Sequence, residues 1–151
     1  MSKVIRVLGT GGTIAGVAAA GAADNRYTAG QLGVRELLDH LPGAASGGGD
    51  GRVRLEPIEV AQIDSSNMSH AVWAELVRAV DLAQQDPQVQ GAVITHGTDT
   101  LEETAVFLDG ALRVDKPVVL TAAMRPATST QADGPTHLRQ ALALAADPQA
   151  R

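Results

Sequence analysis

The sequence predicts an α/β protein built on a doubly wound, mostly parallel sheet. Short runs rich in β-branched residues alternate with longer runs whose apolar residues recur at helical spacing. The later short runs are compact and bounded by Gly or Pro, as expected of parallel strands that are covered on both faces. Strands and helices that alternate in this way imply right-handed crossovers, with helices on both faces of one sheet.

The predicted elements follow in order along the chain. The strands are residues 4–8, 53–60, 92–95 and 118–121. The helical patterns are residues 31–41, 69–83 and 100–112, and a last apolar stripe over 138–145. Pro57 weakens the second strand, because proline cannot donate to a central ladder. Thr100 and Glu103 predict a capping box at the start of the third helix.

A chain of 151 residues fits a single domain over residues 1–151. Residues 14–30 are rich in Gly, Ala and Asp without apolar periodicity, and we expect them to form a mobile lid. Residues 43–52 are expected to form a flexible surface loop rather than a domain linker.

Composition excludes several classes of function. The formal net charge is −5 without a Lys/Arg stripe, which argues against nucleic-acid partners. The absence of cysteine excludes disulfides, thiol nucleophiles and thiolate metal sites. No segment has the roughly 18 apolar residues of a membrane span, so we expect no membrane association. The default expectation is a cytoplasmic location, or a periplasmic one if a signal peptide has been removed.

The histidines do not predict a metal site. They are widely separated and lack the spacing of metal ligands: His40, His70, His96 and His137. Only His96 falls in a candidate site, where we interpret it as structural. The sequence therefore predicts neither a metal nor a cofactor.

Three polar clusters directly follow predicted strands, at residues 9–13, 64–67 and 95–100. In doubly wound sheets, ligands bind at the carboxyl ends of strands, near the point where the strand order switches. The three clusters are therefore the candidate site.

The first cluster is a glycine-rich turn that resembles a nucleotide-binding loop but does not match the sequence motif of either common type. A dinucleotide fingerprint from Gly9 needs a glycine where Ile14 stands, and a P-loop from Gly11 needs a lysine where Val17 stands. A tight turn with exposed N–H groups can hold an oxyanion, and Thr13 beside it can attack an acyl carbon if a base takes its proton. The alternative is a plain turn in which threonine caps a helix.

The other clusters supply further polar groups. Tyr27, the only tyrosine, lies in the expected lid, where its hydroxyl can serve chemistry or merely anchor the loop. Asp99 can pair with a substrate ammonium, and Thr98 can position water or act as a second nucleophile. A helix N-terminus there favours a substrate carboxylate. For the clusters at residues 64–67 and 95–100, the alternative to a role in substrate binding is helix capping.

Together the motifs T-G-G-T-I-A-G, D-S-S-N-M and H-G-T-D-T-L-E-E-T-A resemble bacterial L-asparaginases and glutaminase-asparaginases. The later K-P-V-V-L-T-A-A-M-R-P and A-D-G-P segments fit the same pattern, so the resemblance covers nearly the whole chain. It implies a Rossmann-like or flavodoxin-like amino-terminal domain, cut before the smaller carboxyl-terminal domain. It also implies homotetramers built from close dimers.

The resemblance implies hydrolysis of L-asparagine, and of L-glutamine in some members, to the acid and ammonia. It makes Thr13 the nucleophile that forms an acyl-enzyme, assisted by Tyr27. Thr98 and Asp99 match the second threonine and the aspartate that contact substrate. Substrate-binding positions are also implied for Ser65, Ser66, Gly12, Gly97 and Ala123. Ser66 departs from the glutamine that many periplasmic-type members carry.

One departure concerns a lysine that the family pairs with the second threonine and the aspartate. The chain has only Lys3 and Lys116, and both begin predicted strands, at the edge of the sheet opposite the site. The matching lysine position would fall beyond Arg151. We therefore expect the isolated chain to be inactive, with an apolar sheet edge exposed.

Two alternatives stay open. One is the related amidotransferase subunit that releases ammonia for tRNA-dependent amidation. The missing additional amino-terminal domain and the lack of basic surface count against it. The other is a domain that binds asparagine or aspartate without turnover.

Overall fold

A four-stranded parallel sheet forms the centre of the molecule. The computed structural model describes residues 3–19, 26–41 and 53–150. The strands are β1 (Lys3–Gly11), β4 (Val53–Ile63), β5 (Val89–Thr95) and β6 (Val118–Thr121), in the spatial order β4-β1-β5-β6. All neighbouring pairs are parallel. The predicted doubly wound α/β class is confirmed, and the strand order switches between β1 and β5.

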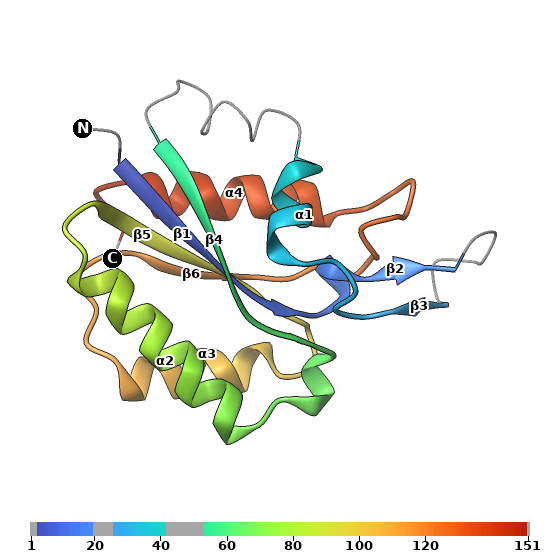
Figure 1. Ribbon diagram of the computed structural model, residues 1–151, viewed down its shortest axis with the longest axis horizontal. Helices are drawn as coiled ribbons and strands as arrows, with labels where there is room; N and C mark the ends of the chain where they lie inside the picture. The colour runs from blue at the N-terminus through green and yellow to red at the C-terminus, as the bar shows by residue number, and fades with distance from the viewer. Residues whose placement is uncertain (1–2, 20–25, 42–52, 151) are drawn as a thin grey trace.

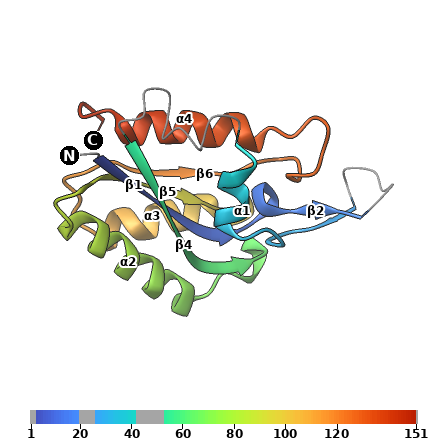
Figure 2. The same ribbon diagram turned by 45° about the horizontal axis from the view of Figure 1, so that its top comes forward.

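Helices cover both faces of the sheet. The helices α1 (Val34–Asp39) and α4 (Gly134–Ala146) lie on one face, and α2 (His70–Gln85) and α3 (Leu101–Ala111) lie on the other (Figures 1 and 2). Side chains of β1 alternate between the two cores, because successive strand residues point to opposite faces. Ile5 and Val7 pack with α1 and α4, while Leu8 packs with α2 and α3.

Strand β4 is longer than predicted, and it contains Pro57. Among the described residues it occupies an edge of the sheet, beside β1, and an edge strand is where a proline is tolerated. The prediction had ended this strand at residue 60. It continues to Ile63, and the register shifts where Gly11 pairs with Ile63.

The predicted capping box at Thr100 is wrong. Thr100 is the N-cap of α3, but its side chain makes no capping hydrogen bond. Its hydroxyl instead donates to the carbonyl of Ser65, 2.9 Å away. A tertiary partner has displaced the local one, and the hydrogen bond ties the start of α3 to the turn that follows β4.

A small antiparallel hairpin projects from the carboxyl edge of the sheet (Figure 1). It consists of β2 (Val17–Ala18) and β3 (Tyr27–Thr28), and we call it the Tyr27 hairpin. Within the predicted lid, residues 20–25 lie outside the described residues, and the expected mobility stays a prediction. The predicted surface loop at 43–52 also lies outside them.

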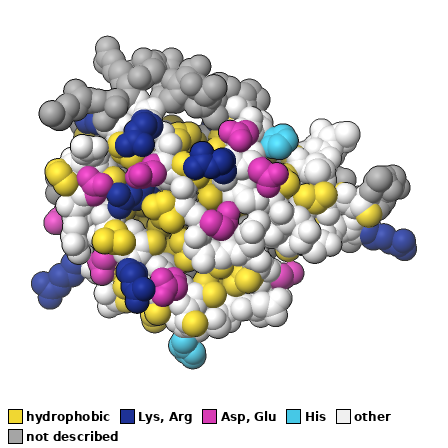
Figure 3. All heavy atoms as spheres, in the orientation of Figure 1, with side chains coloured by type: hydrophobic (Ala, Val, Ile, Leu, Met, Phe, Trp, Pro, Cys, Tyr) yellow, Lys and Arg dark blue, Asp and Glu magenta, His cyan; other side chains and the backbone are white. Residues whose placement is uncertain are grey.

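The described surface is mixed in charge. On the face in Figure 3, basic and acidic side chains are interspersed among apolar ones. In residues 3–19, 26–41 and 53–150, no helix has the length and apolarity that crossing a bilayer requires.

Candidate active site

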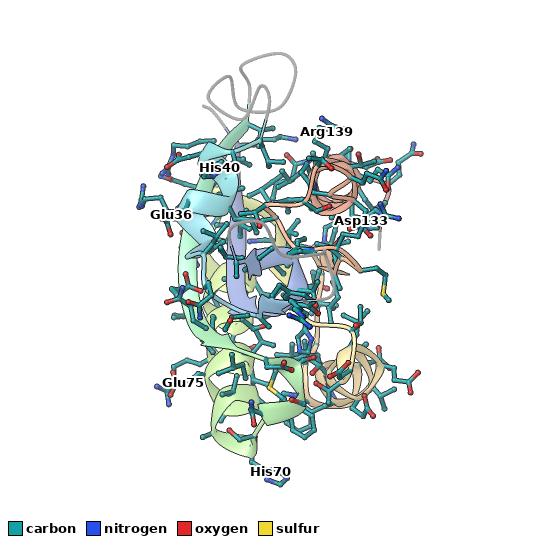
Figure 4. All side chains as sticks on the ribbon, turned by 90° about the vertical axis from the view of Figure 1, so that its right-hand side faces the viewer. Glu36, His40, His70, Glu75, Asp133 and Arg139 are labelled. Atoms are coloured by element: carbon teal, nitrogen blue, oxygen red, sulfur yellow. The ribbon has the colours of Figure 1, made fainter. Side chains whose placement is uncertain are left out.

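The three polar clusters converge at the carboxyl ends of β1, β4 and β5, the edge that Figure 4 faces. Thr13 opens a short 3-10 helix, η1 (Thr13–Ala15), directly after β1. Ser65 opens another, η3 (Ser65–Asn67), after β4. Thr98 and Asp99 lie between β5 and α3. The predicted site is therefore a single place in the fold.

Backbone contact fixes the distance between the first and third clusters. Gly12 has φ 78°, and a Cβ added there would overlap the backbone of Gly97. A Cβ on Gly97 would in turn overlap the side chain of Ser65. Only glycine allows this approach, because any side chain would occupy the space.

Tyr27 reaches Thr13 directly. Their hydroxyl oxygens lie 2.7 Å apart, in a hydrogen bond that either group can donate. Thr13 is buried, whereas Tyr27 is 37% exposed. The tyrosine ring passes so close to Gly16 that a Cβ there would lie 2.8 Å from Cδ2. The nucleophile candidate thus has a phenol oxygen as its immediate partner.

The expectation that the glycine turn leaves its N–H groups free for an oxyanion is wrong at Gly12. The Gly12 N–H donates to the carbonyl of Ile63 at 2.8 Å. Its own carbonyl accepts from Gly30 at 3.0 Å and from Ala15 at 3.2 Å. The turn is therefore fastened to β4 and to the segment that follows Tyr27.

Ser65 connects the second and third clusters. Its side chain is buried, and its Oγ accepts from the Asp99 N–H at 3.2 Å. Thr98 and Asp99 themselves are exposed. Ser65 thus holds a loop whose two polar side chains stay accessible.

Ser66 and Ala123 lie differently. The Ser66 hydroxyl donates to Asp64 Oδ1 at 2.9 Å, and the same oxygen accepts from the Ser66 N–H. Ala123 follows β6 and is buried in the core cluster that also contains Ile14, next to Thr13. Asp64 thus caps η3, which is the alternative role that the sequence left open for the second cluster.

His96 is structural, as predicted. Its Nδ1 lies 2.7 Å from the Gly97 carbonyl, which can only accept, so Nδ1 carries the proton. Nε2 then accepts from the Thr104 hydroxyl at 2.9 Å, and Thr104 accepts from Trp73 Nε1 at 2.9 Å. Burial lowers the pKa of His96, while the hydrogen bond to Gly97 and the charge of Glu103 oppose this shift. The neutral ring braces the loop that carries Thr98.

Neither lysine reaches the site. Lys116 Nζ donates to the carbonyls of Ala83 at 3.1 Å and Asp86 at 2.6 Å, at the carboxyl end of α2. Lys3 is exposed at the first position of β1. Both lie at the amino edge of the sheet, as predicted. Among the described residues, no group of three or more His, Cys, Asp or Glu side chains could hold a metal ion.

Two contact residues were missed by sequence reasoning. Asp133 accepts hydrogen bonds from the Met124 and Arg125 N–H groups, and Thr128 accepts one from the Ala18 N–H in the Tyr27 hairpin. An Asp just before Gly-Pro is a helix-start signal that could have drawn attention to Asp133. Nothing local in the sequence marks Thr128.

The family model "Asparaginase, N-terminal" matches residues 4–151. The chain belongs to the asparaginase family. It is 42% identical over 143 residues to a probable periplasmic L-asparaginase of Haemophilus influenzae. It is 38% identical over 145 residues to a glutaminase-asparaginase of Acinetobacter glutaminasificans. These matches cover 95% and 96% of the chain but only 39% and 42% of the two relatives.

A solved asparaginase structure shows the same fold. The crystal structure of a probable cytoplasmic L-asparaginase from Campylobacter jejuni superposes with a TM-score of 0.87 at 41% identity. The match covers 100% of the chain and 44% of that structure. The chain thus corresponds to the amino-terminal part of these asparaginases.

Proposed function

We propose that this chain is the nucleophile-bearing part of an amidohydrolase that acts on the side-chain amide of L-asparagine. The observation that carries the proposal is the 2.7 Å hydrogen bond between Thr13 and Tyr27. It lies at the switch point of the sheet, beside Thr98 and Asp99. The names of the relatives support asparagine as substrate, and the Acinetobacter relative supports glutamine as a second one.

In the proposed reaction, Thr13 Oγ1 attacks the amide carbon while its proton passes to Tyr27, which must be a phenolate at that moment. The C–N bond then breaks, and the nitrogen takes this proton from Tyr27 and leaves as ammonia, which returns Tyr27 to the phenolate. The product is an acyl ester on Thr13. Water, positioned by Thr98, hydrolyses this ester to release aspartate and restore the Thr13 hydroxyl. Asp99 pairs with the substrate ammonium.

The substrate-binding roles proposed for Ser65, Gly12, Gly97 and Ala123 differ in kind. Ser65 Oγ accepts from Asp99 but keeps its own proton, which can be donated to a substrate carboxylate. Gly12 and Gly97 act through their shape and backbone position, and Ala123 backs the Thr13 turn. The Ser66 hydroxyl can donate to substrate only if it gives up its hydrogen bond to Asp64.

The proposal also covers the isolated chain. Both lysines lie at the opposite edge of the sheet, so neither lysine ammonium can serve Thr98 and Asp99. We therefore expect the 151-residue chain to release no measurable ammonia from asparagine. Robust turnover that depends on Thr13 would contradict this.

The decisive experiment uses a chimera in which residues 1–151 replace the matching segment of the Haemophilus relative. Thr13→Ala should lower its rate of ammonia release by about 10³-fold or more, since it removes the nucleophile. Thr136→Ala, a matched change on the exposed face of α4, is the control and should keep the rate. Full activity of the Thr13→Ala chimera would refute the nucleophile assignment.

Assembly and location are further parts of the proposal. We propose a homotetramer in the cytoplasm for the complete enzyme. The name of the Campylobacter relative supports that location, whereas the Haemophilus relative is named as periplasmic. Analytical ultracentrifugation of the chimera and fractionation of the source cells test the two statements.

A further inference from the structure

We propose that the loop between β6 and α4 is a platform that holds Tyr27 against Thr13, and that Asp133 closes this platform. Asp133 and Thr128 are then positioning residues for the reaction. The inference rests on the proposed function for the role of Tyr27, but the platform itself can be tested without substrate. We call residues 124–133 the platform loop.

The Asp133 carboxylate closes the platform loop on itself. Its Oδ2 accepts from the Met124 N–H at 3.0 Å, and its Oδ1 accepts from the Arg125 N–H at 3.1 Å. Asp133 is the N-cap of α4, yet it makes no side-chain capping hydrogen bond there. Both oxygens instead hold the beginning of the platform loop, just after β6, against its end.

The charge of this carboxylate is also maintained. Burial alone would raise the pKa of Asp133, but the N–H groups of Met124 and Arg125 and the nearby His137 together lower it. His137 lies on the first turns of α4, and its Nδ1 is also 2.9 Å from the Ala122 carbonyl. The loop is thus fastened at both ends to α4.

The closed loop grips the first strand of the Tyr27 hairpin. The Ala127 N–H donates to the Gly16 carbonyl at 2.9 Å, just before β2 begins. The Ala18 N–H donates to Thr128 Oγ1 at 2.9 Å, at the other end of β2. These two hydrogen bonds flank Val17, so the whole of β2 lies along the platform loop.

Strand β2 in turn supports Tyr27, which lies in the paired strand β3. Ala18 pairs with Tyr27 across the hairpin, and Gly16 lies under the tyrosine ring. A hairpin with only two residue pairs is marginal by itself, and more than a third of the surface of Tyr27 is exposed. The hairpin therefore needs an external anchor to keep the phenol 2.7 Å from Thr13.

Nuclear magnetic resonance on the 151-residue chain can test the platform. Tyr27 is the only tyrosine, so its ring protons are unambiguous. We expect the wild-type chain to show a nuclear Overhauser contact between this ring and the Gly16 α protons. Asp133→Asn should weaken that contact and make the Ala18 amide exchange with solvent at least about tenfold faster.

A matched control and a second variant keep the test sharp. Asp147 accepts from the Gln149 N–H at 2.8 Å beyond the other end of α4, so Asp147→Asn should change neither readout. Thr128→Val keeps the shape of the side chain but removes the acceptor for Ala18. It should accelerate exchange of the Ala18 amide as Asp133→Asn does.

Protected β5 amides show that the Asp133→Asn variant is folded. The proposal is overturned if this folded variant retains both the slow exchange of the Ala18 amide and the contact between Tyr27 and Gly16. If Asp133→Asn does not fold, Thr128→Val decides, and an unchanged Ala18 amide overturns the proposal.

A double-mutant cycle in the chimera separates positioning from general stability. Asp133→Asn should lower kcat about tenfold when Tyr27 is present. It should have no further effect in a Tyr27→Phe background, because its influence passes through Tyr27. Equal losses in both backgrounds would overturn the positioning role. If instead Tyr27→Phe retains full activity, the proposed role of Tyr27 fails, while the resonance data still decide the platform.

Discussion

The hydroxyl groups of Thr13 and Tyr27 share a hydrogen bond of 2.7 Å although they belong to different elements. Thr13 begins a 3-10 helix after the central strand β1, whereas Tyr27 lies in β3 of the projecting hairpin. The rigid sheet edge thus presents one oxygen and the hairpin presents the other. The central sheet therefore fixes the position of Thr13, whereas Tyr27 depends on the small hairpin.

Tyr27→Phe should separate chemistry from folding. The change removes the phenol oxygen but keeps the ring that packs on Gly16. In the chimera we expect the rate of ammonia release to fall by about 10²- to 10⁴-fold, the range for loss of a general acid–base group. The free energy of unfolding should change by only about 1 kcal/mol. Steady-state kinetics and urea unfolding measure the two effects, and a rate within twofold of the parent would contradict the prediction.

Gly12→Ala should destabilise the fold strongly. Gly12 has φ 78°, and a Cβ there would overlap the backbone of Gly97. The backbone strain alone costs about 1–3 kcal/mol. Gly110→Ala is the matched control, because an added Cβ on this exposed residue of α3 has no heavy atom within 4 Å. It should stabilise the helix by about 0.5–1 kcal/mol. Equal effects of the two changes on chemical denaturation would be incompatible with the Gly12–Gly97 contact.

The free energy of unfolding should decrease at acidic pH because of His96. Burial lowers the pKa of His96 in the folded state, so the unfolded chain binds the proton first. The free energy of unfolding is then fully retained above about pH 6.5, the ordinary value for histidine. It decreases as the pH falls from there to the folded-state pKa.

Unfolding in urea between pH 8 and pH 5 measures this slope. His96→Gln should flatten it, whereas His40→Gln, at the exposed end of α1, should keep it. An unchanged slope in His96→Gln would show that other groups cause it.

Lys116→Met should affect stability without affecting catalysis. The ammonium group donates to two carbonyls at the end of α2, and loss of such charged hydrogen bonds costs about 1–3 kcal/mol. Lys3→Met, on an exposed residue, should cost little by comparison. Both chimeras should keep their specific rate of ammonia release. A selective loss of rate in Lys116→Met would place this lysine in the site after all.

Much of the fold could be predicted from the sequence because the pattern was local. Apolar runs bounded by Gly or Pro marked β5 and β6, and the helical periodicity of Leu76 and Val80 marked α2. The convergence of the polar clusters followed from a general rule about the carboxyl ends of parallel strands. Thr13, Ser65 and Asp99 could therefore be placed together from the sequence.

The rest depended on partners that are distant in sequence. The Thr100 hydroxyl bonds Ser65, 35 residues away, instead of capping its own helix. The Gly12 N–H is taken by Ile63 because β4 runs three residues beyond its predicted end. The Tyr27 hairpin has only two residues in each strand, too few for any periodic signal. Such features become visible only when the chain is folded.

The close approach of Gly12 and Gly97 has a consequence for redesign. The gap between the two threonine-bearing loops is a main-chain dimension, so no side-chain substitution around the rim can widen or narrow it. A variant meant to accept a longer amide would therefore have to gain its room elsewhere. The side chain of Ser65 and the hairpin that contains Tyr27 are the parts of this site that can be redesigned.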